Sequence, residues 1–405
     1  MMWLILLIIL LAIYLCGFFF APFPLWKTYI YLWKAIFTKN YSMINLHARK
    51  KQAIFLLKYA IFSPIWTFFW YLDEILYSNY KSIEIKPIFI IGQPRCGTTF
   101  LHRTLAKSNQ FVAIKHIEWR YPYIAFQKIL KYSGLANIIM HKNYWPTTEA
   151  GRVAAKMHPN HLSDWEEEGI FFEECFLHHF FIYFRFPYPD IFEYLDNFQN
   201  LPDRIQRQIM HTHRKVIQKM FYLHHGAGKF YLSKEVTSHD KIPYILKLYP
   251  EARFIVSLRK SNDFLNSLLP LVKFSTQSKN GIDPMYIPGW ENKIIQKMKK
   301  DCSILMNISD NHVFQQNQIK VVFSHLITDV KSTINQIFAF LQLDISEEYQ
   351  TYLSTLHERQ KRRNRGYEND KRRFCGFQDY DRFVQKAELE ACSQHFRVVP
   401  SHFLD

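Results

Sequence analysis

The chain has 405 residues, of which 48% are hydrophobic and 17% aromatic, so a disordered or low-complexity protein is excluded. Its length suits one large α/β domain with an appendage, or two ordinary domains. Lys and Arg total 51 against 35 Asp and Glu, and the net charge of +16 favours a polyanionic substrate, an anionic lipid or a nucleic acid as partner.

The N-terminus, residues 1–20, is an apolar run without a charged side chain, long enough for a helix to cross the hydrocarbon core of a membrane. We expect a membrane anchor rather than a cleaved signal peptide, because no basic residues precede the run and Ala21-Pro22 is a poor cleavage context. Lys27 and Lys34 follow the run, and positive flanks favour the cytoplasm. The rest of the chain is therefore expected on the cytoplasmic side.

A second apolar stretch, residues 53–72, is interrupted by Lys58 and Pro64. Three interpretations stay open for it: an interfacial helix, a second membrane pass or a helix of the protein core. We expect residues 1–80 to form the anchor with an apolar helical segment, and residues 81–405 to form the main domain.

From Lys86 onward, short apolar runs of β-favouring residues alternate with segments of helical length. The runs are residues 87–91, 111–114, 230–233, 254–258 and 319–323. This alternation predicts an α/β fold, with a parallel sheet covered by helices on both faces. Ligands of such sheets bind beyond the carboxyl ends of the strands, so site residues should follow the runs. Residues 121–228 are expected to be helical insertions that shape a substrate pocket.

Residues 88–101 read IFIIGQPRCGTTFL, which predicts a strand, a tight loop and a helix whose first turn offers N–H groups to an anion. Gly92 and Gly97 have the spacing of a nucleotide-binding loop, but Thr98 replaces its lysine, which argues against ATP chemistry. Arg95 instead places a guanidinium within the loop, suited to gripping a phosphate and the group being transferred. The expected binding residues of this loop are Gly92, Arg95, Cys96, Gly97, Thr98 and Thr99.

This loop resembles that of the sulfotransferase superfamily, in the branch whose loop reads G-x-P-R-S-G-T-T, as in tyrosylprotein, carbohydrate-type and bacterial enzymes. Further segments resemble the family in order: YLSK at 231–234, YPEARF at 249–254, RFIVSLR at 253–259 and the run from 321 to 343. The resemblance covers residues 87–377. It implies a P-loop-type domain that transfers a sulfuryl group from 3′-phosphoadenosine-5′-phosphosulfate to an acceptor hydroxyl on a sugar, lipid, phenol or peptide.

The resemblance also implies residue roles. Arg259 and Ser267 would hold the 3′-phosphate of the donor, and Lys234 would reach the bridging or sulfuryl oxygens, while Arg95 neutralises charge on the leaving phosphate. The family keeps its base after the second strand, where Glu118 is the expected base and His116 the alternative. The sequence departs from the family at Cys96, at Lys260-Ser261 and after Lys234, where Ser-Pro-x-His is replaced. These departures put the loop around Lys234 in doubt.

Three other readings are weaker. A P-loop kinase or NTPase needs a lysine in the loop and an aspartate that binds magnesium at the end of a strand. This sequence lacks both residues, since Arg259 stands at the end of the corresponding strand. A membrane-tethered polyanion binder would use the basic stretch 359–373, which we expect to be a loop; its arginines could instead close over the donor. The cluster from His158 to Glu168 lacks a recognised ligand spacing, and the scattered cysteines contain no C-x-x-C pair. We therefore expect no metal and no nucleic-acid partner.

Overall fold

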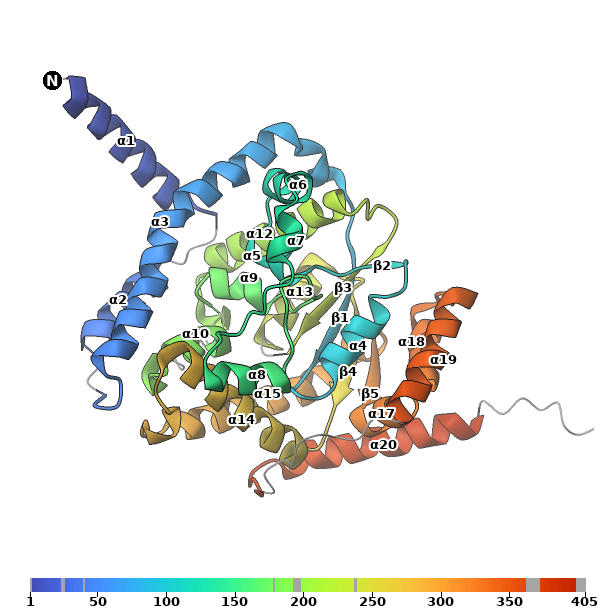
Figure 1. The fold of residues 1–405 in the computed structure, drawn as a ribbon. Helices are drawn as coiled ribbons and strands as arrows, with labels where there is room; N and C mark the ends of the chain where they lie inside the picture. Colours follow the sequence, from blue (N-terminus) through green and yellow to red (C-terminus); the bar gives the residue numbers. More distant parts are fainter. Residues whose placement is uncertain are drawn as a thin grey trace, which may run out of the picture.

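The computed structural model describes residues 2–22, 26–38, 41–177, 179–191, 198–236, 239–361 and 372–397. Its centre is a five-stranded parallel sheet of order β2-β3-β1-β4-β5 (Figure 1). The strands are β1 (Lys86–Gly92), β2 (Phe111–Val112), β3 (Phe230–Glu235), β4 (Arg253–Leu258) and β5 (Gln318–Val322). Each predicted run overlaps one of these strands, so the predicted α/β fold with a parallel sheet is confirmed.

The central strand β1 is buried on both faces of the sheet. Its side chains alternate between two hydrophobic cores, because successive residues of a strand point to opposite faces. Phe89 and Ile91 belong to the larger core, and Ile88 and Ile90 to the smaller one. This explains the continuous apolar sequence of the strand, which would alternate if one face met water.

Helices cover both faces of the sheet. The smaller core is closed by α4 (Thr98–Leu105), α18 (Val330–Leu341) and α19 (Glu347–Lys361). The larger core is closed by α12 (Asp203–Leu223), α14 (Ser261–Asn280) and α15 (Trp290–Ser309). The other helices of the body are α5 (His116–Arg120), α6 (Ile124–Tyr132), α7 (Leu135–Ile139), α8 (Glu149–Met157), α9 (Gly169–Glu174), α10 (His179–Arg185), α13 (Ile242–Leu248), α16 (His312–Gln315), α17 (Phe323–Thr328) and α20 (Gln378–Arg397).

The N-terminal segment consists of α1 (Met2–Phe19), α2 (Trp26–Thr38) and α3 (Leu46–Leu76). Helix α1 projects away from the body and crosses α3 near its own C-terminal end (Figure 1). At the crossing, a Cβ on Gly17 would lie 2.8 Å from Cβ of Pro64, so only glycine allows this approach. The inner side of α3 joins the larger core through Leu56 and Trp70, which are buried.

Helix α3 contains the whole second apolar stretch and continues through Pro64. By length and composition, α3 is the helix of the described chain that could cross a membrane, and α1 is a shorter apolar helix. Large apolar side chains on the outer side of α3, including Leu57, Ile61 and Phe68, are exposed. One side of this helix therefore packs in the core while the other remains uncovered.

The basic stretch 359–373 differs from the expected loop at its start, because residues 359–361 are the last residues of α19. Residues 362–371 lie outside the described chain. Beyond them, α20 returns to the sheet and its Asp381 accepts hydrogen bonds of 2.7 Å from the N–H and the hydroxyl of Ser261, at the start of α14. This contact fixes the helix that carries Ser267.

Candidate active site

The turn after β1 requires glycine at two positions. Gly92 has φ of +142°, and a Cβ there would lie 2.2 Å from the carbonyl oxygen of Ser257 on β4. Gly97 caps α4 with φ of +85°, and a Cβ would lie 2.9 Å from the Phe323 ring. Backbone conformation and space both exclude other residues. The first turn of α4, which begins at Thr98, leaves N–H groups without helical partners in an arrangement suited to anions.

Two arginines and a serine meet beside this turn. Arg95 stands within it at φ of +70°, and its Nε donates a hydrogen bond of 2.9 Å to Oγ of Ser267 on α14. Arg259 follows β4 and donates a hydrogen bond of 2.8 Å to the carbonyl oxygen of Arg95. The structure therefore brings together three predicted binding residues from segments more than 160 positions apart.

Cys96 is the predicted loop residue that faces inward. Its side chain is fully buried, and burial raises the pKa of the thiol to about 12. A neutral thiol with no exposed surface contributes packing rather than charge. Cys96 therefore contributes to the loop through its backbone.

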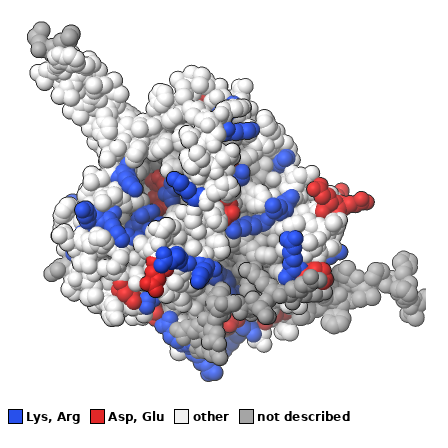
Figure 2. Space-filling model, in the orientation of Figure 1, with Lys and Arg blue, Asp and Glu red and all other residues white. Residues whose placement is uncertain are grey.

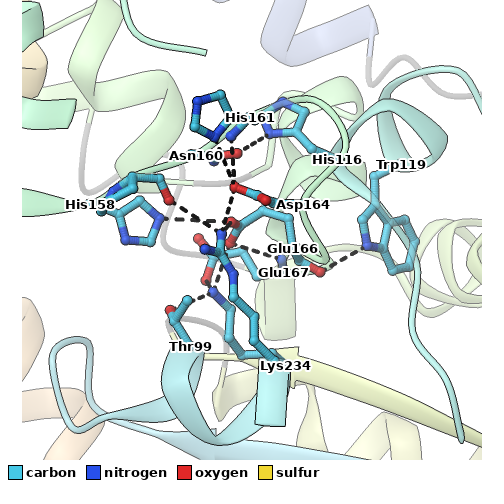
Figure 3. A network of polar contacts seen from close by, with 12 residues as sticks. Thr99, His116, Trp119, His158, Asn160, His161, Asp164, Glu166, Glu167 and Lys234 are labelled. Atoms are coloured by element: carbon cyan, nitrogen blue, oxygen red, sulfur yellow. Dashed lines mark hydrogen bonds and ion pairs between the residues drawn. The ribbon is translucent and has the colours of Figure 1, made fainter. Parts of the chain in front are cut away.

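Lys234 lies at the carboxyl end of β3 and points to the same turn (Figure 3). Its Nζ donates hydrogen bonds of 3.0 Å to Oγ1 of Thr99 and 2.7 Å to a carboxylate oxygen of Glu166, and lies 3.6 Å from Glu167. The lysine is buried, which would disfavour its charge, but the two carboxylates raise its pKa above the usual range. A buried ammonium ion thus stands beside the turn after β1.

The glutamates reach Lys234 because their segment is held at the end of the sheet. Trp165 forms an antiparallel bridge with Lys115, which follows β2. The N–H of Glu166 donates to Ile114, and the N–H of Glu168 donates to the carbonyl oxygen of Lys234. Carboxylates that lie more than 50 residues beyond the second predicted strand in the sequence therefore stand at its end.

The three glutamates have different surroundings. Burial opposes ionisation of Glu166, but Lys234, His158 and Arg103 together hold its pKa far below the usual range. Burial and the neighbouring carboxylate of Glu166 raise the pKa of Glu167, despite the opposing Lys234. Glu168 accepts hydrogen bonds of 2.8 Å and 2.9 Å from hydroxyls on β3. Glu166 and Glu168 are tied into the protein, whereas Glu167 is the glutamate of this segment that lines a cavity.

A cavity of about 840 Å³ opens above the turn. It is large enough for a small-molecule ligand, and basic residues dominate its charged lining. These basic residues are Arg95, Arg103, Lys107, Lys115, Lys156, Lys234 and Arg259. Figure 2 shows Lys and Arg side chains spread across this side of the body, separated by few acidic ones. Such a lining fits a nucleotide with several phosphates.

The expected base, Glu118, is held away from the cavity lining. Its carboxylate accepts a hydrogen bond of 2.8 Å from the N–H of Lys115 at the start of α5 and lies 2.9 Å from Nε2 of His224. His116 is buried, which lowers its pKa to about 4, and its Nδ1 lies 3.0 Å from Oδ1 of Asn160. Neither Glu118 nor His116 lines the cavity, whereas Asn160 does. The base role predicted for Glu118 stays a prediction.

Sequence reasoning assigned no role to Glu167 or Arg103, although the signal for Arg103 was present. Arg103 stands four residues after Thr99 on α4, a spacing that places both on one helix face. It contacts Asp164 at 3.2 Å and Glu166 at 3.5 Å. Arg103 thus offsets the negative charge of Asp164 and Glu166. Among the described residues, no group of three His, Cys, Asp or Glu side chains could hold a metal ion.

Comparisons with known proteins bear on the family and the fold of this chain. The sulfotransferase family matches residues 87–347, which is more than half of the chain. The crystal structure of sulfotransferase STF1 from Mycobacterium tuberculosis H37Rv is similar over 89% of this chain and 91% of that one, with 15% identity and a TM-score of 0.61. For sulfotransferase STF9 from Mycobacterium avium the shares are 92% and 96%, with 13% identity and a TM-score of 0.60. No curated protein matches the sequence. The two structures support the fold, and the family match shows that this chain belongs to the sulfotransferase family of enzymes.

Proposed function

We propose that this enzyme transfers a sulfuryl group from 3′-phosphoadenosine-5′-phosphosulfate to an acceptor hydroxyl in the cavity above the loop. The meeting of Arg95, Ser267 and Arg259 beside that loop carries the proposal. The loop N–H groups and Arg95 hold the 5′-phosphosulfate, while Arg259 and Ser267 hold the 3′-phosphate. The place of Arg95 within the loop also supports our proposal that the chain belongs to the arginine-loop branch of the family.

In the reaction, the bond between sulfur and the bridging phosphate oxygen breaks, and sulfur bonds to the acceptor oxygen. The leaving phosphate gains negative charge, which Arg95 and Lys234 stabilise, and 3′,5′-diphosphoadenosine remains. The acceptor proton needs a base. Glu167 lines the cavity beside Lys234, its side chain is 12% exposed, and its raised pKa suits a proton acceptor.

Donor identity is tested by ligand-induced stabilisation. We expect 3′,5′-diphosphoadenosine to raise the melting temperature of the wild type more than ATP does at equal concentration, since a ligand that binds the native state stabilises it. Arg259→Ala should weaken this binding about tenfold or more, because a charge-assisted contact is worth ~1.5 to 3 kcal/mol. Binding of adenosine-5′-phosphosulfate, which has no 3′-phosphate, should change little.

The matched control is Arg204→Ala, which removes an exposed arginine of α12 with the same charge. It should leave all three thermal shifts unchanged. A wild type that prefers ATP with magnesium would count against the sulfotransferase chemistry proposed for the loop. Equal weakening of all three nucleotides by Arg259→Ala would remove the 3′-phosphate role from Arg259.

We also propose that α1 anchors the enzyme in a membrane, with the body on the cytoplasmic side. Helix α1 has no charged residue, and its large apolar side chains are exposed from Trp3 onward. In Figure 2 the projecting helix shows no basic or acidic side chain among its described residues. A helix of this kind avoids water by entering lipid.

Deleting residues 2–20 should move the protein from the membrane pellet to the soluble fraction, because α1 exposes large apolar side chains along most of its length. Fractionation by ultracentrifugation measures this. The deleted form should keep its thermal shift with 3′,5′-diphosphoadenosine, which shows that the body is folded. A folded form that stays in the pellet would assign the attachment to the exposed side of α3.

A further inference from the structure

A second cavity, of about 770 Å³, lies between α3 and the body, away from the nucleotide loop. We propose that it admits the acceptor, and that this acceptor is a membrane lipid with a hydroxyl-bearing head. This inference rests on the proposed function and on α1 as anchor, and it names the substrate class. The head would reach the sulfuryl group through the inner end of the cavity while the acyl part remains on the membrane side.

The mouth of the second cavity lies where the proposed anchor meets the body. Ala21 and Pro22, directly after α1, line it, as do Ile54 and Phe62 of α3. Ile54 is 43% exposed and Phe62 44%, so apolar side chains form an open rim. Figure 2 shows a hollow with basic and acidic side chains beside the base of α1. A molecule leaving the membrane along α1 would meet this rim first.

The interior of the second cavity offers two hydroxyl groups that have no hydrogen-bond partner among the described residues. Ser63 is 2% exposed and Thr67 4%, and both line the cavity from α3. Within the described residues, neither hydroxyl makes a hydrogen bond. Buried hydroxyls without partners are costly, and a bound head with hydroxyl groups would satisfy them.

Charged side chains gather at the inner end of the second cavity. Arg120 and Arg185 pair with Glu173 at 2.7 Å and 3.3 Å. Lys279 lies beside them, and its Nζ sits 4.0 Å from the ring centroid of Tyr144. Burial and the two arginines lower the pKa of Lys279. Donors next to a carboxylate suit a polar head and would not suit an acyl chain.

The two cavities stand back to back across a thin partition. Tyr144 and Trp145 line the nucleotide cavity, and the next residue, Pro146, lines the second. On α10, Phe184 likewise lines the nucleotide cavity, and the next residue, Arg185, lines the second cavity. Lys279, which lines the second cavity, contacts the ring of Tyr144, which lines the nucleotide cavity. Moving these two side chains would join a path from the membrane side to the cavity that holds Glu167.

The test uses the full chain in membranes of the organism that encodes it, with donor labelled by ³⁵S. We expect label in chloroform-soluble material. Ser63→Trp should reduce that label at least about tenfold, because its ring would fill the space of the head. Ile61→Trp is the matched control, since it adds the same ring to the same helix on the opposite, exposed side, and it should keep the label.

The thermal shift with 3′,5′-diphosphoadenosine separates the two proposals. A wild type without this shift would reject the proposed function itself. If the wild type shows the shift, two outcomes would overturn the lipid route. One is that the label appears only in protein or water-soluble material, and the other is that the Ser63→Trp and Ile61→Trp variants label lipid equally. If the Ser63→Trp variant misfolds and loses the shift, the Lys279→Met variant tests the lipid route instead. It replaces the side chain that contacts the head by one of similar size, and it should also lower lipid labelling.

Discussion

Replacing Arg95 with alanine should lower kcat/KM for sulfuryl transfer by ~100-fold or more, the usual scale for removing a preorganised group that stabilises developing charge. Arg95 stands within the loop, bonded to Ser267, where the leaving phosphate gains charge. The φ of +70° at position 95 is no less favourable for alanine than for arginine, because both side chains carry a Cβ. The loop should therefore keep its shape in the variant. A steady-state assay with labelled donor measures the effect.

Loss of fold is the competing explanation for an inactive Arg95→Ala variant, and thermal unfolding without ligand separates the two. The variant should melt close to the wild type, because Arg95 is only partly buried. Arg204→Ala, with the same loss of charge at an exposed site, should keep full turnover. Near-normal turnover of a folded Arg95→Ala protein would reject the role of the loop in stabilising the leaving phosphate.

The sheet and its loop were predictable because their causes are local. Continuous apolar runs mark strands that are covered on both faces, and each of the five runs overlaps a strand. Gly92 and Gly97 are required by backbone angles and close contacts. The approach of Arg259 and Ser267 to the loop was implied by the family resemblance, and it agrees with the rule that parallel strands present ligand contacts at their carboxyl ends.

The structure of residues 53–72 was not predictable, because Pro64 and Lys58 had no visible compensation in the sequence. Proline removes one helical hydrogen bond and usually kinks or ends a helix. Here α3 continues, with Gly17 of α1 packed against Pro64 and Leu56 buried in the larger core. Tertiary contacts from distant segments therefore decide the path of this helix.

The glutamates beside Lys234 were missed for a similar reason. Glu118 follows the second strand in sequence, so resemblance favoured it as the base. Glu166 and Glu167 reach the same end of the sheet through the bridge between Lys115 and Trp165. A bridge between residues 50 positions apart leaves no local pattern, and only the folded chain shows which carboxylate lines the cavity.

The base assignment gives the second large expected effect. Glu167→Gln should lower kcat by ~100-fold or more, the scale of general-base catalysis, and leave the thermal shift with 3′,5′-diphosphoadenosine unchanged. For the wild type, kcat should fall as pH drops through the raised pKa of Glu167, so its acid limb should lie above the usual ~4.3 of a glutamate. The pH profile of kcat measures this limb.

Stability gives an independent check on Glu167. A carboxyl whose pKa is raised by burial stabilises the fold when protonated, and this contribution is lost as pH rises through the raised pKa. The neutral Glu167→Gln protein should therefore be at least as stable as the wild type at neutral pH.

The Glu118→Gln variant should instead be less stable than the wild type at neutral pH. Burial opposes ionisation of Glu118, but contacts with His224 and Lys115 lower its pKa, so it stabilises the fold when ionised. That contribution is present above its unfolded pKa and lost as pH falls through the folded one. The variant should lose ~1.5 to 3 kcal/mol of stability at neutral pH and keep its turnover. A folded Glu118→Gln or His116→Ala enzyme with crippled kcat, beside an active Glu167→Gln, would return the base to the end of the second strand.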